Sequence, residues 1–415
     1  MDKIFVQIAS YRDPQLIPTI RDCLEKAGNP ERLVFSIAWQ HAVEDEWDNL
    51  DEFKNNPRFR IVDIDYSKTR GTCWARNLLQ KNYSNEKYTL LLDSHHRFTE
   101  NWDQELISMY RQLKARGHEK PLLTSYLCSF NPENDPRAKT NVPQKMNFDR
   151  FTPEGVILFL PAAIHNYKEL SAPVPARFFS AHFAFTTGRF VREVPHDPDY
   201  YFHGEEISIA VRAFTWGYDL FHPHKVLAWH EYTRKGRKKH WDDDQTWNDR
   251  NQTSFLKNKK LFQMDGEVRD IDFGFFDFGA QRTLEDYERY AGISFKKRGV
   301  QKYTLDNHPP PNPPLFGQEL ENSWLTVFRH CIRIHRDNFN IKHDYDFCAV
   351  IFEDDTDRQM YRKDLSGQEL KALLKADDEF ITITRQFNTE KKPSKWVVWP
   401  HSSTKGWLNR IVGKL

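Results

Sequence analysis

Three side chains in this sequence have the chemistry of a divalent-metal site, and two of them end a strand-like run. Residues 88–95 read YTLLLDSH, an apolar run that stops at Asp93 and His95. Two positions apart in extended chain, these side chains point the same way, so an oxygen and an imidazole nitrogen can share one cation. His230, in the later motif WHEY, offers a third ligand. This mixed donor set suits manganese, whereas magnesium prefers oxygen ligands alone.

Each of these residues also has a structural interpretation. Asp93 could cap the turn that follows it, with His95 incidental, and His230 could belong to an aromatic-rich corner. The buried character of the preceding run favours the metal site, because ligands bind outside the carboxyl ends of the strands in parallel sheets.

A bound cation can neutralise the diphosphate of a nucleotide-activated donor, and several other residues could contact such a nucleotide. Asp13 follows the first strand-like run, where it could cap a helix and also accept hydrogen bonds from a nucleobase. Arg70 and Arg76 flank an expected helix start, and helix N-termini attract phosphate. The basic run that begins at Arg234 suits a mobile lid over a pyrophosphate. Solvent-exposed arginines and a solvated loop are the alternatives.

Two acidic residues, Glu205 and Glu206, follow Gly204 at the start of another expected helix. The helix macrodipole favours acids in a first turn, which is a sufficient structural explanation. The functional alternative is that one carboxylate faces a bound sugar or an acceptor hydroxyl.

The elements that must position these residues alternate between strand and helix. This alternation predicts a doubly wound, mostly parallel α/β sheet. The expected strands are residues 4–9, 33–39, 60–64, 88–92 and 219–229. One expected helix begins at Asp13-Pro14, and the others span residues 72–82, 102–116 and 204–214.

The sequence NHPPPNPP at residues 307–314 predicts a stiff linker. We therefore expect a domain of residues 1–300, a linker of 301–316 and a small, β-rich C-terminal module of 317–415. Within the module, the expected strands are residues 345–353, 379–387 and 396–399, and the expected helix is 367–376.

Composition narrows the functional classes. With 415 residues and 39% hydrophobic residues, the chain can bury a sizeable core. A net charge of +1 gives no signature of nucleic-acid binding. The five cysteines are scattered, which indicates a reducing compartment and no structural zinc. Without a recognisable secretory signal or bilayer-spanning run, a cytoplasmic protein is expected. Peripheral membrane association and the oligomeric state stay open.

Several sequence blocks resemble the family 60 glycosyltransferases, which include a cytosolic enzyme that adds N-acetylglucosamine to hydroxyproline. The blocks are IFVQIASYRDPQLIPTI, RGTCWARNLL, LLLDSHHRF and HGEEISIAVRAFTWGYDLFHP leading into WHEY. The same blocks locally resemble the polypeptide N-acetylgalactosaminyltransferases, which have glycine where this chain has His203. The resemblance covers roughly residues 3–295.

The resemblance implies a GT-A fold, a UDP-sugar donor, Mn²⁺ (with Mg²⁺ as the alternative) and retention of anomeric configuration. By position, Asp93, His95 and His230 would bind the metal, and Asp13 and Arg76 would contact the nucleotide. Asp93 and Glu205 would be the residues nearest the chemistry, with Glu205 beside the donor sugar and the acceptor.

We therefore expect transfer from UDP-GlcNAc to a hydroxyl on a protein or a glycan. The alternatives are another UDP-sugar, such as UDP-GalNAc, with a surface polysaccharide as acceptor, a metal-dependent nucleotidyltransferase or sugar hydrolase, and a non-catalytic carbohydrate-binding protein.

Overall fold

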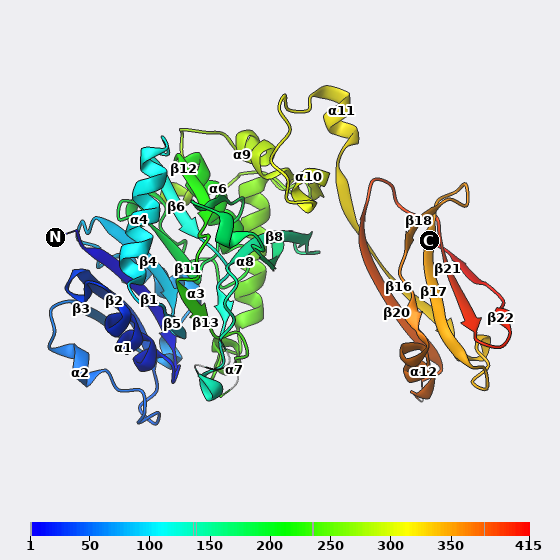
Figure 1. Cartoon of the computed structure of the whole chain (residues 1–415), viewed down its shortest axis with the longest axis horizontal. Coiled ribbons are helices and arrows are strands. Elements are labelled where there is room, and N and C mark those ends of the chain that lie inside the picture. Colours follow the sequence, from blue (N-terminus) through cyan, green and yellow to red (C-terminus); the bar gives the residue numbers. More distant parts are fainter. Residues whose placement is uncertain (1, 136, 138, 235, 377) are drawn as a thin grey trace. The chain divides into compact units, whose positions relative to one another are not determined.

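The computed structural model describes residues 2–135, 137, 139–234, 236–376 and 378–415. The chain divides into two compact units (Figure 1). The first comprises Met1–Lys296 with Tyr303–Asn312, and the second comprises Lys297–Lys302 with Pro313–Leu415. Much of the proline-rich stretch therefore groups with the first unit.

The first unit is built on an eight-stranded sheet in the order β10-β12-β6-β11-β4-β1-β2-β3. Four neighbouring pairs are parallel, whereas β11 and β10 run antiparallel to their neighbours. The predicted mostly parallel α/β sheet is thus confirmed. The strands are β1 (Ile4–Tyr11), β2 (Leu33–His41), β3 (Phe59–Asp65), β4 (Tyr88–Asp93), β6 (Lys120–Thr124), β10 (Val174–Pro175), β11 (Phe183–Thr187) and β12 (Tyr218–His222).

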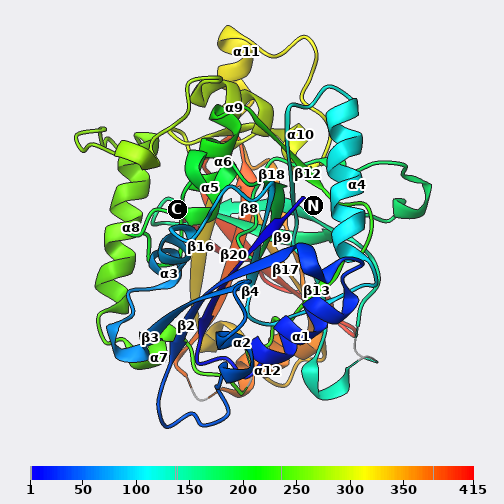
Figure 2. The ribbon, with the colours of Figure 1, turned by 90° about the vertical axis from the view of Figure 1, so that its left-hand side faces the viewer.

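Helices cover both faces of this sheet, with α1 and α4 on one side of β1, β2 and β4 and with α3 and α8 on the other (Figure 2). Leu16 and Ile20 of α1 and Trp102 of α4 join the main core, while Ala75 and Leu79 of α3 form a second cluster. The helices are α1 (Leu16–Lys26), α2 (Asp51–Lys54), α3 (Thr72–Gln80), α4 (Trp102–Ala115), α5 (Phe190–Glu193), α6 (Glu205–Thr215), α7 (His240–Asp243), α8 (Trp247–Phe262), α9 (Leu284–Ala291) and α10 (Lys302–Leu305).

Two predicted boundaries are wrong. Helix α1 begins at Leu16 with Gln15 as its N-cap residue. Asp13 instead accepts a hydrogen bond from the Gln15 N–H in the turn before the helix, and its other oxygen contacts His95. The segment 219–229, expected as one strand, is split into β12 and β13 (Ala228–His230) by a turn containing Pro223.

That split matters, because β13 joins a small sheet at the tip of β4. In it, β13 pairs antiparallel with β5 (His96–Phe98) and parallel with β7 (Cys128–Ser129). The register places His230 opposite His96, directly after the DSH motif. A separate antiparallel pair is formed by β8 (Gln144–Phe151) and β9 (Ile157–Ala163), and β14 (Ile293–Ser294) closes the list of strands in this unit.

The second unit is β-rich, as predicted, with α12 packed against β17. The long strand β16 was not predicted, although its sequence LTVFRHCIRIH alternates apolar and polar residues. One sheet contains β15 (Gly299–Val300), β16 (Leu325–His335) and β20 (Phe380–Thr389). The other contains β17 (Tyr345–Glu353), β18 (Gln359–Arg362), β19 (Leu365–Ser366), β21 (Lys395–Ser402), β22 (Gly406–Trp407) and β23 (Ile411–Lys414). Its helices are α11 (Gly317–Asn322) and α12 (Gly367–Lys375).

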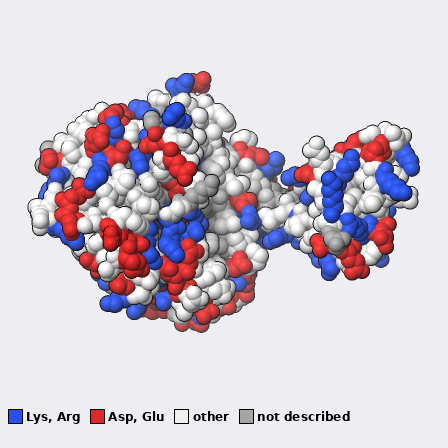
Figure 3. All heavy atoms as spheres, turned by 90° about the horizontal axis from the view of Figure 1, so that it is seen from below, with Lys and Arg blue, Asp and Glu red and all other residues white. Residues whose placement is uncertain are grey.

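Basic and acidic side chains are interspersed on the face drawn in Figure 3. Within the described residues, no helix combines the length and the apolar character that crossing a bilayer requires.

Candidate functional site

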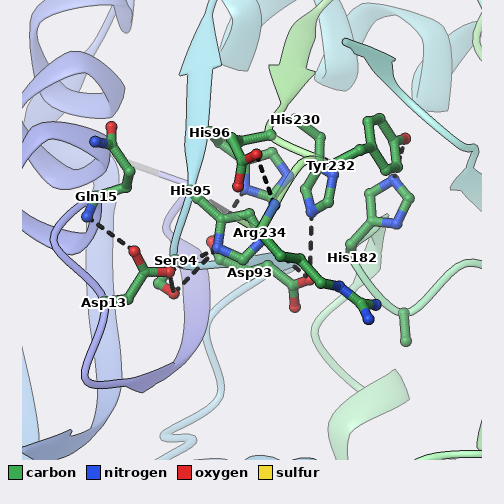
Figure 4. A network of polar contacts seen from close by, with 12 residues as sticks. Asp13, Gln15, Asp93, Ser94, His95, His96, His182, His230, Tyr232 and Arg234 are labelled. Carbon is green, nitrogen blue, oxygen red and sulfur yellow. Dashed lines mark hydrogen bonds and ion pairs between the residues drawn. The ribbon is translucent and has the colours of Figure 1, made fainter. Parts of the chain in front are cut away.

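The three predicted metal ligands meet at the carboxyl end of β4. Oδ2 of Asp93 lies 3.4 Å from Nε2 of His230 and 3.8 Å from Nε2 of His95. One ligand atom from each residue lies within 4.8 Å of the others. Figure 4 shows the two imidazoles and the carboxylate converging from β4, the turn after it and β13. The pairing of β13 with β5 brings His230 to this point across more than 130 residues of sequence.

The spacing of these atoms fits one shared ion. Ligands bonded at about 2.1 Å to the same ion lie roughly 3 to 4 Å apart, depending on the angle between them. The two distances from Asp93 fall in this range. Burial lowers the pKa of His230 well below its usual value, so the ring is neutral and can offer a lone pair. The residues present therefore fit a divalent cation with mixed nitrogen and oxygen ligands.

His95 is held in place by Asp13, whose carboxylate oxygen Oδ2 lies 2.7 Å from Nδ1 of the imidazole (Figure 4). With a proton on Nδ1, the imidazole leaves Nε2 free to face Asp93, which is the arrangement that commonly orients a metal-binding histidine. Ser94 and Arg237 also donate to Asp13, at 2.6 and 3.1 Å. Burial opposes ionisation of Asp13, but His95 and Arg237 outweigh it and lower the pKa to about 2.

The side chain of Asp13 contacts His95, and its expected contact with the nucleotide stays a prediction. Nη1 of Arg237 also lies 2.7 Å from Nδ1 of His95, and because a guanidinium only donates, this contact is a hydrogen bond only when Nδ1 carries no proton. Arg237 was not singled out individually in the sequence, because nothing distinguishes it from its basic neighbours.

Arg76 lies at the centre of a buried ion-pair network. Its Nη2 donates to Oδ1 of Asp93 at 2.7 Å, and its Nη1 donates to Oε1 of Glu205. The thiol of Cys73 donates to the other oxygen of Glu205. Burial raises the pKa of Asp93, but His230 and Arg76 outweigh it and hold that pKa well below its usual value. Arg76 thus keeps Asp93 charged and directs Oδ2 towards the two imidazoles.

Two further aromatic residues support the site: Tyr232, the last residue of the WHEY motif, and His182, which was not predicted. The ring of His182, at the start of β11, lies 4.3 Å from the ring of His230 at an interplanar angle of 25°. The hydroxyl of Tyr232 lies 3.3 Å from Nε2 of His182, and its ring packs edge-on against His230. Burial lowers the pKa of His182 well below its usual value. These contacts fix the His230 ring without adding charge.

Of the other two predicted nucleotide contacts, Arg234 lines the cavity beside the ion site (Figure 4), and Arg70 is not among the residues that line it. Arg70 is exposed and makes no hydrogen bond or ion pair with the described residues. Arg234 is also exposed, with its guanidinium 5.3 Å from the Trp241 ring, and it lines the adjoining cavity. Lys235, part of the expected lid, lies outside the described residues.

A cavity of about 980 Å³ adjoins the ion site. Asp93 and His230 line it on one side, and Glu205 and Glu206 line it from the start of α6. The β8–β9 pair contributes an apolar wall that includes Leu158 and Leu160. The cavity therefore offers an anionic and imidazole-rich end for a metal diphosphate, with room beside it for a sugar.

Comparison with protein families now identifies the chain. The sequence matches the model of the glycosyltransferase (GlcNAc) family over two overlapping segments, residues 3–58 and 49–297. This chain belongs to that family. The resemblance to glycosyltransferases is thus confirmed, as is the fold class, a GT-A α/β domain with a β-rich C-terminal module.

Solved structures with distant similarity include other glycosyltransferases. GalNAc-T7 with UDP, GalNAc and Mn²⁺ is 12% identical with a TM-score of 0.46, covering 69% of this chain and 50% of the other. S. aureus TarS 1–349 with UDP-GlcNAc is 11% identical with a TM-score of 0.36, covering 58% and 61%. PcManGT, a mannosyltransferase from Pyrobaculum calidifontis with GDP-Man and Mn²⁺, is 12% identical with a TM-score of 0.36, covering 57% and 58%.

The match spans about half the length of the GalNAc-T7 chain. Comparison with curated proteins gives no match. The family model, rather than these distant structures, identifies this glycosyltransferase.

Glu206 gives the glycosyltransferase a pH-dependent stability that can be measured. Burial raises the pKa of Glu206 from 4.5 to about 8, although the Ala181 N–H donates to it at 2.9 Å. The folded state thus prefers the neutral acid, and stability present below pH 4.5 is lost as the pH rises towards about 8. We compare the melting temperatures of Glu206→Gln and wild type at each pH. The difference, variant minus wild type, should increase between about pH 5 and 8 and then level off.

Differential scanning fluorimetry of both proteins tests this expectation. Glu288, whose pKa burial raises to about 7, is present in both proteins, so its contribution cancels in the difference. A difference that is flat across this range would show that Glu206 is ionised in the folded protein.

Proposed function

We propose that this glycosyltransferase moves N-acetylglucosamine from UDP-GlcNAc to a hydroxyl acceptor in a metal-dependent, retaining reaction. The observation that carries the proposal is the convergence of Asp93, His95 and His230 at the end of a large cavity. Their donor set suits Mn²⁺, with Mg²⁺ as the alternative. The family description supplies the sugar.

The three residues would hold the ion, and Asp13 and Arg76 would orient two of them. When bound, manganese supplies a Lewis acid that stabilises charge on the diphosphate of the leaving UDP. Arg234 and Arg237 follow β13 and could add positive charge beside the same diphosphate.

Glu205 is placed near the sugar in this proposal, but it is not a nucleophile. Both of its oxygens are engaged, one by Arg76 and the other by Cys73. Retention is then achieved by attack of the acceptor oxygen on C1 from the face that UDP leaves. The C1–phosphate bond breaks as the new C1–oxygen bond forms, and the acceptor proton passes to the departing phosphate oxygen.

We further propose that the acceptor hydroxyl belongs to a protein side chain (Ser, Thr or hydroxyproline) or to a glycan. All five cysteines are free, which supports a reducing compartment such as the cytoplasm.

A donor panel tests the function. We expect UDP release from UDP-GlcNAc in the presence of Mn²⁺, loss of release with EDTA, and at least tenfold slower release from UDP-GalNAc and UDP-glucose. Mass analysis of the product should show an added N-acetylhexosamine, and NMR should show the α-anomer. Faster turnover of UDP-GalNAc would overturn the sugar assignment. Products that carry a nucleotide, or free sugar with no transfer, would support a nucleotidyltransferase or a hydrolase instead.

A further inference from the structure

The second unit carries a compact group of aromatic side chains on one face of its larger sheet. Phe347 of β17 pairs with His401 of β21, and His401 pairs in turn with Trp407 of β22, so their side chains share a face. Trp399, two residues before His401, lies on the same face. The ring centroids of Trp399 and Trp407 are 4.2 Å apart, and those of Phe347 and Trp407 are 5.2 Å apart. These four residues form the aromatic platform.

Trp407 is the exposed member of the platform, whereas Phe347, Trp399 and His401 are half-buried. Cys348, Val350 and Val398 point to the opposite face, into the core that also contains Leu370 of α12. On the platform side, Trp407 is 42% exposed even though its indole packs against Trp399. The exposed part of Trp407, held by Trp399 and Phe347, is the surface that this face offers to a ligand.

The charged groups that touch the platform are already paired. Arg362, whose guanidinium lies 5.8 Å from the Trp407 ring, forms a two-pronged contact with Asp364 at 2.7 and 2.8 Å. Arg410 lies 5.1 Å from the Trp399 ring and donates to Glu353 at 2.9 Å.

His401 completes the rim through Asp346, 2.8 Å from its Nδ1. We call Arg362, Arg410, His401 and Asp346 the rim of the platform. Their hydrogen-bond donors and acceptors are held in fixed positions, and the charges of the two arginines are paired. A polyanion such as nucleic acid is held by cations beside its stacking rings, and both of these guanidinium groups are already paired with a carboxylate. The rim instead complements an uncharged ligand that is rich in hydroxyl groups.

We propose that the aromatic platform binds a neutral pyranose residue of a glycan chain. One face of a pyranose presents C–H groups that can pack on the exposed part of the Trp407 indole, while its hydroxyls can bond to polar groups such as Arg362, Arg410 and Asp346. The second unit would in this way hold a glycan independently of the donor site in the first unit.

The test uses the full chain with neutral and charged hexasaccharides. Isothermal titration calorimetry is performed with N-acetylglucosamine hexamer, cellohexaose, maltohexaose and a heparin hexasaccharide. We expect at least one neutral hexamer to bind more tightly than heparin, and Trp407→Ala to weaken that binding about tenfold or more.

Trp407→Phe keeps an aromatic ring and should stay within about threefold of wild type. The matched control is Trp247→Ala, which removes a tryptophan of similar exposure, 39%, from the first unit and should change nothing. The proposal would be overturned if wild type and Trp407→Ala bound equally well, if no neutral hexamer bound, or if heparin bound more tightly. It would also be overturned if Trp407 bound a protein instead of a glycan. Because binding is measured without UDP-sugar, its failure is distinguishable from failure of the proposed transfer.

Discussion

Replacing Asp93 with asparagine is expected to lower glycosyl transfer about a thousandfold or more. The amide keeps the size of the side chain but loses the negative charge that binds the proposed cation. Asparagine can still accept a hydrogen bond from Arg76, which also remains paired with Glu205. The melting temperature should therefore fall by only a few degrees. Initial rates of UDP release, measured beside thermal melting, report both quantities.

Asp63→Asn is the matched control for this variant. Asp63 lies on β3 with 63% of its side chain exposed and makes a surface contact with His41. It should keep wild-type activity. If Asp93→Asn retained more than about a tenth of the wild-type rate, the carboxylate would not be a metal ligand in turnover.

Replacing Arg76 with methionine is expected to cause the largest loss of stability, about 3 to 5 kcal/mol. The substitution leaves the carboxylates of Asp93 and Glu205 without their shared partner in a buried site. Activity should also fall, because Asp93 loses the group that orients it. The double variant Arg76→Met/Glu205→Gln should recover part of the stability, since one of the two stranded charges is then removed. Urea unfolding of both variants measures the free energy of unfolding.

Arg21→Met provides the comparison. Arg21 forms an exposed ion pair with Glu52, and such pairs contribute about 0 to 1 kcal/mol. If Arg76→Met lowered the free energy of unfolding by less than about 1 kcal/mol, the buried network would contribute little to stability. Hydration or protonation of Asp93 and Glu205 would then replace the contact with Arg76.

The sequence predicted the site best where the local hydrophobic pattern and the topology of a parallel sheet indicate the same position. The apolar run before Asp93 predicts a buried strand, and the position of ligands at the ends of parallel strands then places Asp93 and His95 at a site. The convergence of His230 on them depends on the antiparallel pairing of β13 with β5. That pairing joins segments far apart in the sequence, so the motif around His230 and the family resemblance predicted its role as a ligand but not the pairing itself.

The partners of the site residues were not predictable, because they depend on side-chain packing between elements. Asp13, after β1, pairs with His95, after the neighbouring strand β4, and Arg76 reaches Asp93 and Glu205 from α3. His182 has no sequence feature that separates it from a core histidine. The long helix α8 was missed as well, since its polar sequence WNDRNQTSFLKNKKLF has a weak apolar stripe.

The most direct test of the central claim is a crystal structure with Mn²⁺ and UDP, with anomalous scattering recorded at the manganese edge. We predict an anomalous peak between Oδ2 of Asp93 and the Nε2 atoms of His95 and His230, with the diphosphate of UDP beside it. A manganese peak elsewhere, with UDP bound away from these three side chains, would contradict the account.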